Sequence, residues 1–157
     1  MSGIDNSART SADELWRGHA AELLRFATVL VGPHDAGDIV VEAVLRSERS
    51  IAAGNVRSPR AYLFRAVANH ASDLRRGRMR RWARDLAAIG PAHSDGPDTF
   101  VDVRRAVAKL SVVQRAVVFL AYWEDMTERD IADLLQLSPG TVHRHLDLAR
   151  THLRKVL

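Results

Sequence analysis

The sequence predicts an all-α protein made of two small helical domains joined by a flexible linker. Apolar residues recur at intervals of three and four through most of the chain, and no stretch alternates as a strand would. Gly, Pro, Ser and Asp concentrate in residues 90–98, which predicts the linker there. We therefore expect a disordered N-terminus over residues 1–10, a first domain over residues 11–89 and a second over residues 99–157.

The first domain is predicted to contain three helices. Ser11 and Glu14 have the spacing of a capping box, which predicts the start of the first helix. This helix is expected to end at Gly32, and the second to begin near Asp35. Ser58, followed directly by proline, predicts the start of a long third helix.

The second domain ends in two helices joined by a tight turn. Thr127 is a candidate N-cap for the first of them, and Ser138 followed by Pro139 has the pattern of a cap with proline at the first helical position. Apolar residues of the second helix recur at intervals of four and three: Val142, Leu146, Ala149, Leu153 and Val156. This arrangement is typical of a helix-turn-helix, whose second helix enters the major groove of DNA.

The opposite face of that second helix carries small, polar and basic residues. They are Thr141, Arg144, Leu148, Thr151 and Lys155. The alternative is that the basic residues only keep an exposed helix face in contact with solvent, which is common in helical hairpins. The spacing of the two caps around the turn is more specific than the charge, so it favours DNA binding.

A basic block lies in the first domain. Residues 60–84 contain eight arginines and one aspartate, Asp73. Arginines this close repel one another, and nucleic-acid phosphate would relieve the repulsion. A membrane surface is the alternative, which the few apolar residues of the block disfavour. Tyr62, Phe64 and Asn69 add rings and an amide suited to unstacked bases, although aromatic residues at helical spacing usually belong to a core.

Composition limits the cellular compartments and the kinds of site that the sequence is compatible with. The net charge of +4 and the pI of about 10.3 favour an acidic partner. The chain has no cysteine, which excludes disulfides and thiolate zinc sites within it and is typical of cytosolic proteins. No apolar run approaches the roughly 20 residues of a membrane span, and the N-terminus does not look like a signal peptide. We expect a cytoplasmic protein without a membrane span.

Seven histidines raise the question of a metal or catalytic site. His143 and His145 point to different sides of a helix, and His145 lies roughly 10.5 Å along the axis from His152, too far for a shared metal ion. The more economical interpretation of His145 and His152 is packing beside the apolar stripe. The sequence contains no P-loop, HExxH motif or nucleophile elbow, so we expect no catalytic residue, metal or cofactor.

The order of these parts resembles the bacterial RNA polymerase sigma factors of the extracytoplasmic function (ECF) type, within the sigma-70 family. The matching segments are LLRFATVLVG (23–32), DIVVEAVLR (38–46), SPRAYLFRAVANHASDLRR (58–76), DVRRAVAKLSVVQRAVVFLAYWEDMTERDIADLLQLSPGTVHRHL (102–146) and LARTHLRK (148–155). The resemblance implies that the first domain is a region 2, the second a region 4, and that the protein is not an enzyme.

The resemblance also implies roles for individual residues. The part expected to contact core RNA polymerase contains Asp38, Glu42, Leu45 and Arg46. The part expected to melt and read the −10 promoter element as a single strand contains Tyr62, Arg65, Asn69, Asp73, Arg75, Arg76, Arg78, Arg80 and Arg81. The part expected to read the −35 element contains Ser138, Gly140, Thr141, His143, Arg144, Leu148 and Thr151. An anti-sigma factor held between the two domains is a further implied partner.

The chain departs from the family pattern in two helices. Gly37 and Val41 stand where an acid and a glutamine are usual, which implies weaker polymerase docking. His143, Arg144, His145 and Leu148 stand where lysine, serine, arginine and arginine are usual, which implies an unusual −35 sequence. We predict that Arg144 reads a guanine through two hydrogen bonds.

Two other functions stay open. One is a sigma-like helix-turn-helix regulator that binds duplex DNA without polymerase. The other is a module that binds polymerase or an anti-sigma factor and starts no transcription. The sigma interpretation predicts that the two halves have separate cores and that the arginines of residues 75–84 face away from protein.

Overall fold

The computed structural model describes residues 3–85 and 99–156, and the side chains of residues 12–81 and 103–156. Within these ranges the chain forms α-helices and no strand, which confirms the all-α class. The helices are α1 (Gly3–Val31), α2 (Pro33–Ala52), α3 (Pro59–Asp85), α4 (Thr99–Ala108), α5 (Val112–Tyr122), α6 (Glu128–Leu135) and α7 (Pro139–Val156). The predicted linker, residues 90–98, lies outside the described residues.

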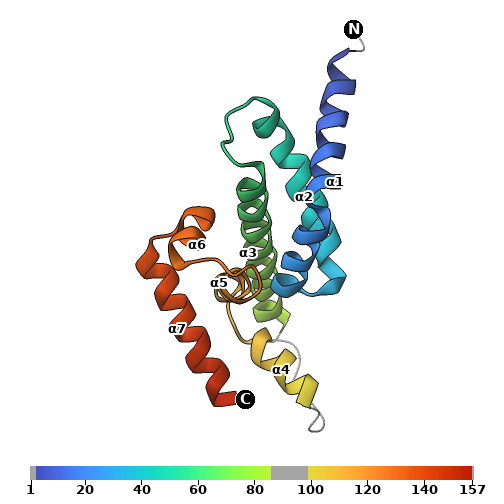
Figure 1. Ribbon diagram of the computed structural model, residues 1–157. Helices are drawn as coiled ribbons and strands as arrows, with labels where there is room; N and C mark the ends of the chain where they lie inside the picture. Colours follow the sequence, from blue (N-terminus) through green and yellow to red (C-terminus); the bar gives the residue numbers. More distant parts are fainter. Residues whose placement is uncertain (1–2, 86–98, 157) are drawn as a thin grey trace.

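Helices α1, α2 and α3 pack together as the N-terminal half (Figure 1). Gly32, at φ 88°, turns the chain between α1 and α2, a left-handed conformation that favours glycine. The helix α1 begins at Gly3, so the predicted start at Ser11 is corrected, and residues 3–10 are helical where the sequence predicts disorder. No proline interrupts residues 3–31, so the local capping signal at Ser11 does not stop the helix from extending toward the N-terminus.

The C-terminal half contains the predicted helix-turn-helix. The Thr127 hydroxyl accepts a hydrogen bond from the Asp130 backbone N–H at 3.2 Å, and Ser138 accepts one from Thr141 at 3.1 Å. Between the two helices Gln136 adopts the left-handed conformation at φ 59° and ends α6. Caps therefore begin both helices where the sequence places them.

The buried stripe of α7 is shorter than the sequence predicts. Val142, Leu146 and Ala149 are buried, whereas Leu153 is half-buried and Val156 is exposed. The last turns of α7 therefore bury less of their apolar face than the first turns do.

The two halves share one core, which contradicts the prediction of separate cores. The Phe26 ring of α1 lies 4.9 Å from the Phe64 ring of α3 and 5.4 Å from the Phe119 ring of α5. The buried cluster continues from α1 through α5 to Leu146 of α7. The reason lies in α5, VVQRAVVFLAY, which is apolar around most of its circumference and is therefore covered on several sides. Figure 1 shows α5 nearly end-on between α3 and the α6–α7 pair.

No described helix is both long and apolar enough to cross a membrane.

Candidate nucleic-acid interface

The outer face of α7 is available to a ligand. His143, Arg144, Leu148 and Thr151 are exposed, and Thr141 is half-buried beside its cap. The exposure of Leu148, 46%, is high for a large apolar side chain and indicates that no described part of the chain covers this face. Gly140 lies in the first turn and has space around it, so the backbone there is open to close approach.

Two residues predicted to contact DNA from α7 have structural partners. The hydroxyl of Ser138 caps the helix and shares a 2.7 Å hydrogen bond with the Thr141 hydroxyl. The Nδ1 atom of His143 lies 3.1 Å from a carboxylate oxygen of Glu128 in α6. The first contact caps the start of α7, and the second joins α7 to α6.

The other two histidines of α7 face partly inward, as the packing interpretation predicts. His152 lies 3.2 Å from the backbone oxygen of Ala106, and it joins α7 to α4. The Nδ1 atom of His145 is buried and has no partner among the described residues. Burial, followed by the nearby charge of Arg144, lowers the pKa of His145.

A cavity of about 310 Å³ is lined by residues of both α2 and α3. Its lining includes Tyr62, Arg65 and Asn69 of α3, and Arg46 from α2. A ring, an amide and two guanidinium groups thus surround a space that opens to solvent. The structure brings these residues together across two helices, which sequence spacing alone does not establish for Arg46.

The described arginines of α3 that follow Arg60 divide into two groups. Arg76, Arg78, Arg80 and Arg81 are exposed, as predicted. Arg76 pairs with Asp73 one turn away, and Arg78 pairs with Asp35 of α2 at 2.7 Å. The side chain of Arg84 lies outside the described residues.

Arg65 and Arg75 face the C-terminal half instead of solvent. The Nε of Arg65 donates to the backbone oxygen of Leu134 in α6 at 3.0 Å. Arg75 donates to the oxygens of Leu110 at 2.6 Å and Ala108 at 3.0 Å. For Arg75 this corrects the prediction that the side chain faces away from protein. The last carbonyl groups of a helix lack partners within it and carry partial negative charge, so they attract guanidinium groups.

The face of α2 predicted to contact polymerase is exposed. Asp38, Glu42 and Arg46 lie on it, and Arg46 pairs with Glu42 at 2.6 Å. Leu45 is 60% exposed on the same face, and Val41 beside it is 44% exposed. Two large apolar side chains flanked by charges on one helix form a surface that another protein could cover.

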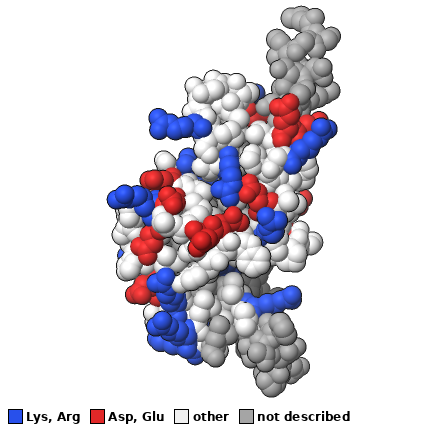
Figure 2. Space-filling view, in the orientation of Figure 1, with Lys and Arg blue, Asp and Glu red and all other residues white. Residues whose placement is uncertain are grey.

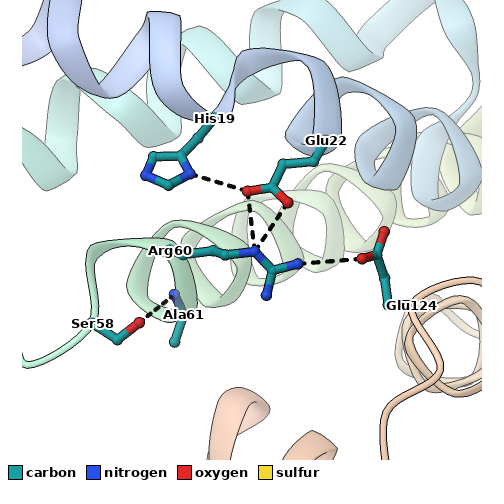
Figure 3. Close-up of polar contacts among 6 residues, drawn as sticks. All are labelled: His19, Glu22, Ser58, Arg60, Ala61 and Glu124. Atoms are coloured by element: carbon teal, nitrogen blue, oxygen red, sulfur yellow. Dashed lines mark hydrogen bonds and ion pairs between the residues drawn. The ribbon is translucent and has the colours of Figure 1, made fainter.

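Sequence reasoning missed an ion cluster that joins the two halves (Figure 3). Arg60 at the start of α3 lies 3.0 Å from a carboxylate oxygen of Glu22 in α1 and 3.3 Å from one of Glu124, just after α5. The guanidinium also lies 4.7 Å from the centre of the Phe64 ring. Burial opposes ionisation of Glu22, but His19 and Arg60 outweigh it and lower the pKa of this carboxylate.

Sequence reasoning also missed the role of Arg115 in α5. Its guanidinium donates to Leu30 at the end of α1 at 2.7 Å, and to Val107 and Ala108 at the end of α4 at 3.0 and 2.7 Å. Burial and the neighbouring charge of Arg75 lower the pKa of Arg115 to about 10. Arg115 carries no sequence signal for this role, because its partners are backbone oxygens of other helices.

Acidic and basic side chains are interspersed over the visible face of the molecule (Figure 2). Because the charge is mixed on this face, its attraction for DNA depends on particular side chains more than on a broad positive field. The exposed face of a capped helix-turn-helix, together with the arginine-rich α3, defines a DNA-binding protein.

Comparison with known proteins identifies the family. Residues 100–153 match the family described as Sigma-70, region 4. The ECF RNA polymerase sigma factor SigL of Mycobacterium tuberculosis is 31% identical over 153 residues, which cover 91% of this chain and 86% of SigL. SigM of the same species is also 31% identical, over 95% of this chain and 78% of SigM. The chain belongs to the ECF RNA polymerase sigma factors.

Two further relatives bear on length and fold. SigE of Mycolicibacterium smegmatis, also an ECF RNA polymerase sigma factor, is 32% identical over 98% of this chain, which spans 64% of SigE. Among solved structures, the sigma factor RpoE from Bartonella quintana, in complex with the anti-sigma factor NepR, superposes with a TM-score of 0.69. The identity is 20%, with coverage of 92% of this chain and 94% of RpoE, so this likeness supports the fold.

Proposed function

We propose that this chain binds core RNA polymerase and directs promoter-specific transcription initiation, the N-terminal half reading the −10 element and the C-terminal half the −35 element. The observation that carries the proposal is the capped, outward-facing α7 in a chain of this family. The protein has no catalytic role of its own and acts in the cytoplasm, where polymerase and promoters are found.

The −35 element is read by α7. Arg144 and Thr151 are exposed on one face with Leu148, and Ser138 and His143 hold the helix at its start. A helix presented this way fits the major groove, where arginine recognises guanine through two acceptors. Thr141 and Gly140 lie in the first turn, from which recognition helices commonly contact bases and phosphates.

The −10 element is read as a single strand by the cavity between α2 and α3. Tyr62 supplies a ring for stacking, Asn69 an amide that reads a base edge, and Arg65 and Arg46 positive charge. Stacking of a base on an aromatic side chain contributes about 1–3 kcal/mol. The exposed arginines beyond the cavity, Arg76 to Arg81, provide charge for the phosphates, and Asp73 holds Arg76 in place.

Core polymerase docks on the exposed face of α2. Leu45 supplies the large apolar contact, and Asp38, Glu42 and Arg46 the charged surround. Exchange of Glu42 for arginine reverses the charge of this face and should abolish initiation. The same exchange at Glu14, exposed on α1, is the matched control and should leave initiation intact.

An anti-sigma factor is a further proposed partner. The neighbouring structure of RpoE contains the anti-sigma factor NepR, and the two folds agree over most of both chains. Co-purification of a small partner protein with the full chain from the native host would test this proposal, and its absence would count against an anti-sigma factor.

A run-off transcription assay with core polymerase and a promoter library tests the function. Transcripts that depend on this chain support the sigma assignment. Duplex binding without transcripts in the presence of polymerase would favour a regulator that works alone. Polymerase binding without transcripts would favour a module that sequesters polymerase.

A further inference from the structure

We infer that His143 selects the base at one position of the −35 element, and that Glu128 of α6 determines which class of base it selects. The inference rests on the proposed function for the assignment of α7 to this element. The two side chains form a pair across the helix-turn-helix. In this pair His143 is the specificity-determining residue and Glu128 is a positioning residue.

Glu128 holds one nitrogen of the His143 ring. The Nδ1 atom lies 3.1 Å and 3.2 Å from the two carboxylate oxygens of Glu128. An ionised carboxylate accepts hydrogen bonds and cannot donate them, so Nδ1 carries a proton in this contact. The hydrogen bond at one ring nitrogen determines the role of the other. In the neutral ring, Nε2 is therefore an acceptor.

The Nε2 atom of the ring is free to meet a ligand. The His143 side chain is 65% exposed, and within the described residues Nε2 has no hydrogen-bond partner. His143 lies in the second turn of α7, which begins at Pro139. Residues near the N-terminus of a recognition helix are the ones that contact base edges. The ring thus presents one free acceptor in the part of α7 that approaches the bases.

A free acceptor in this position recognises a base and not a phosphate. Phosphate oxygens accept hydrogen bonds, as Nε2 of the neutral ring does, so the two cannot bind each other. In the major groove adenine and cytosine present amino groups that donate, whereas guanine and thymine present oxygens that accept. Neutral His143 should therefore select an amino base, adenine or cytosine, over a keto base, guanine or thymine.

Protonation of the ring should reverse this selection. Imidazole side chains change charge between about pH 5 and about pH 8. Nδ1 carries a proton in both charge states, so its bond to Glu128 and the orientation of the ring are kept. Only Nε2 changes, from an acceptor to a donor. The imidazolium form of His143 should therefore select a keto base at the same position.

Charged groups of both signs lie near the pair. Arg144 and Asp147 belong to the same helix as the ring, and Arg150, one turn further on, interacts electrostatically with Glu128 and Asp147. The Nε of Arg150 donates to the hydroxyl of Tyr122 in α5 at 2.6 Å. Arg150 therefore attracts Glu128 without replacing the ring as its hydrogen-bond partner.

Selection of full-length protein on a randomised duplex library, at about pH 8 and about pH 5.5, tests the inference. His143→Lys, which restores the residue usual in this family, only donates. Glu128→Gln keeps a side chain of the same shape, but its amide either accepts from Nδ1 or donates to it, so the proton is no longer fixed there. Asp133→Asn removes a charge from an exposed residue of the same helix and is the matched control. Circular dichroism confirms that all variants are folded at both pH values.

With the native chain we expect one position to favour amino bases about fivefold at about pH 8, equivalent to about 1 kcal/mol, and keto bases at about pH 5.5. His143→Lys should favour keto bases at both pH values. Glu128→Gln should lose most of the amino-base preference, and Asp133→Asn should keep it. A preference that does not change with pH, or one that Glu128→Gln leaves intact, would overturn the inference.

Nitrogen NMR spectroscopy of the isotope-labelled chain supplies an arm that needs no DNA. Chemical shifts distinguish protonated from unprotonated ring nitrogens, and His143→Lys identifies the His143 signals by their loss. At about pH 8 we expect the proton on Nδ1 in the native chain and in Asp133→Asn, and a mixture of tautomers in Glu128→Gln. A proton on Nε2 in the native chain would overturn the role of Glu128. Absence of transcripts in the run-off assay, with these results intact, would reject the sigma function and leave base selection by His143 standing.

Discussion

Arg75 of α3 and Leu110, which follows α4, are joined by a hydrogen bond of 2.6 Å from guanidinium to backbone oxygen. Arg75 lies in a segment whose other described arginines face solvent, and Leu110 belongs to the half that carries the helix-turn-helix. One side chain thus links the surface proposed for opened DNA to the domain proposed for duplex DNA. The two halves are therefore in direct contact at the arginine-rich part of α3.

The shared core predicts that the halves unfold together. Truncation of Phe119 to alanine, which empties a buried position beside Phe26, should destabilise the protein by about 3–5 kcal/mol. Urea unfolding followed by circular dichroism should show one transition at a lower midpoint. Trp123→Ala is the control, since this ring is 70% exposed, and its cost should be much smaller. A variant in which only one half unfolds would contradict the shared core.

The caps of the helix-turn-helix predict a local cost. Ser138→Ala removes the acceptor for the Thr141 backbone N–H and should destabilise α7 by about 1 kcal/mol. Ser138→Gly should cost only a few tenths of that. Hydrogen exchange in the first turn of α7 measures the effect, and equal exchange in all three proteins would show that the cap has no role.

Arg144 should discriminate among promoters. Arg144→Ala is expected to lose about 1–3 kcal/mol of preference at one base pair of the −35 element. Exchange of the exposed Lys155 for alanine is the comparison, and should weaken binding to all sequences alike. Selection from a randomised duplex library measures both. Uniform weakening by Arg144→Ala would mean that this side chain contacts phosphate only.

His145 should make stability depend on pH. Burial lowers its pKa below the ordinary value of 6.5, so the folded protein binds a proton less readily than the unfolded chain. Because the unfolded state then holds more protons, the free energy of unfolding should fall as the pH drops below 6.5. His145→Gln should flatten this dependence. Urea titrations across this pH range measure the free energy of unfolding of both proteins. If this free energy depends on pH in the same way in both, His145 does not cause the dependence.

Glu22 should make stability depend on pH at lower pH values than His145 does. Its pKa is lowered in the folded state, so its contribution is present above the pKa of the unfolded chain and is lost as pH falls through the folded value. The stability difference between the native chain and Glu22→Gln should therefore shrink on acidification. A difference that stays constant with pH would show that the ion cluster contributes nothing.

Local features of the fold follow from the sequence, and contacts between distant segments do not. The caps at Thr127 and Ser138 depend on partners three residues away, so spacing predicts them. The extension of α1 to Gly3 was missed because a capping signal at Ser11 does not prevent a helix from starting earlier. The bond between Arg60 and Glu124 joins residues 64 positions apart, and only the packing of α5 brings them together.

The candidate site divides in the same way. Family resemblance places Tyr62 and Asn69 in the −10 reader, and the structure gives them a common cavity with Arg46. That Arg65 and Arg75 point to the other half could not be inferred, because their acceptors are backbone carbonyls that any sequence supplies. Charge patterning shows which side chains are cationic, but only the tertiary structure shows which groups those side chains contact.

Permanganate footprinting of promoter DNA bound to polymerase and this chain tests the central claim most directly, because it detects unpaired thymines. With the native chain we predict protection at −35 together with reactive thymines at −10. Asn69→Ala should keep the protection and lose the reactivity, and Arg144→Ala should weaken the protection first. Undiminished thymine reactivity with Asn69→Ala, at native protection of −35, would contradict the assignment of opened DNA to α3.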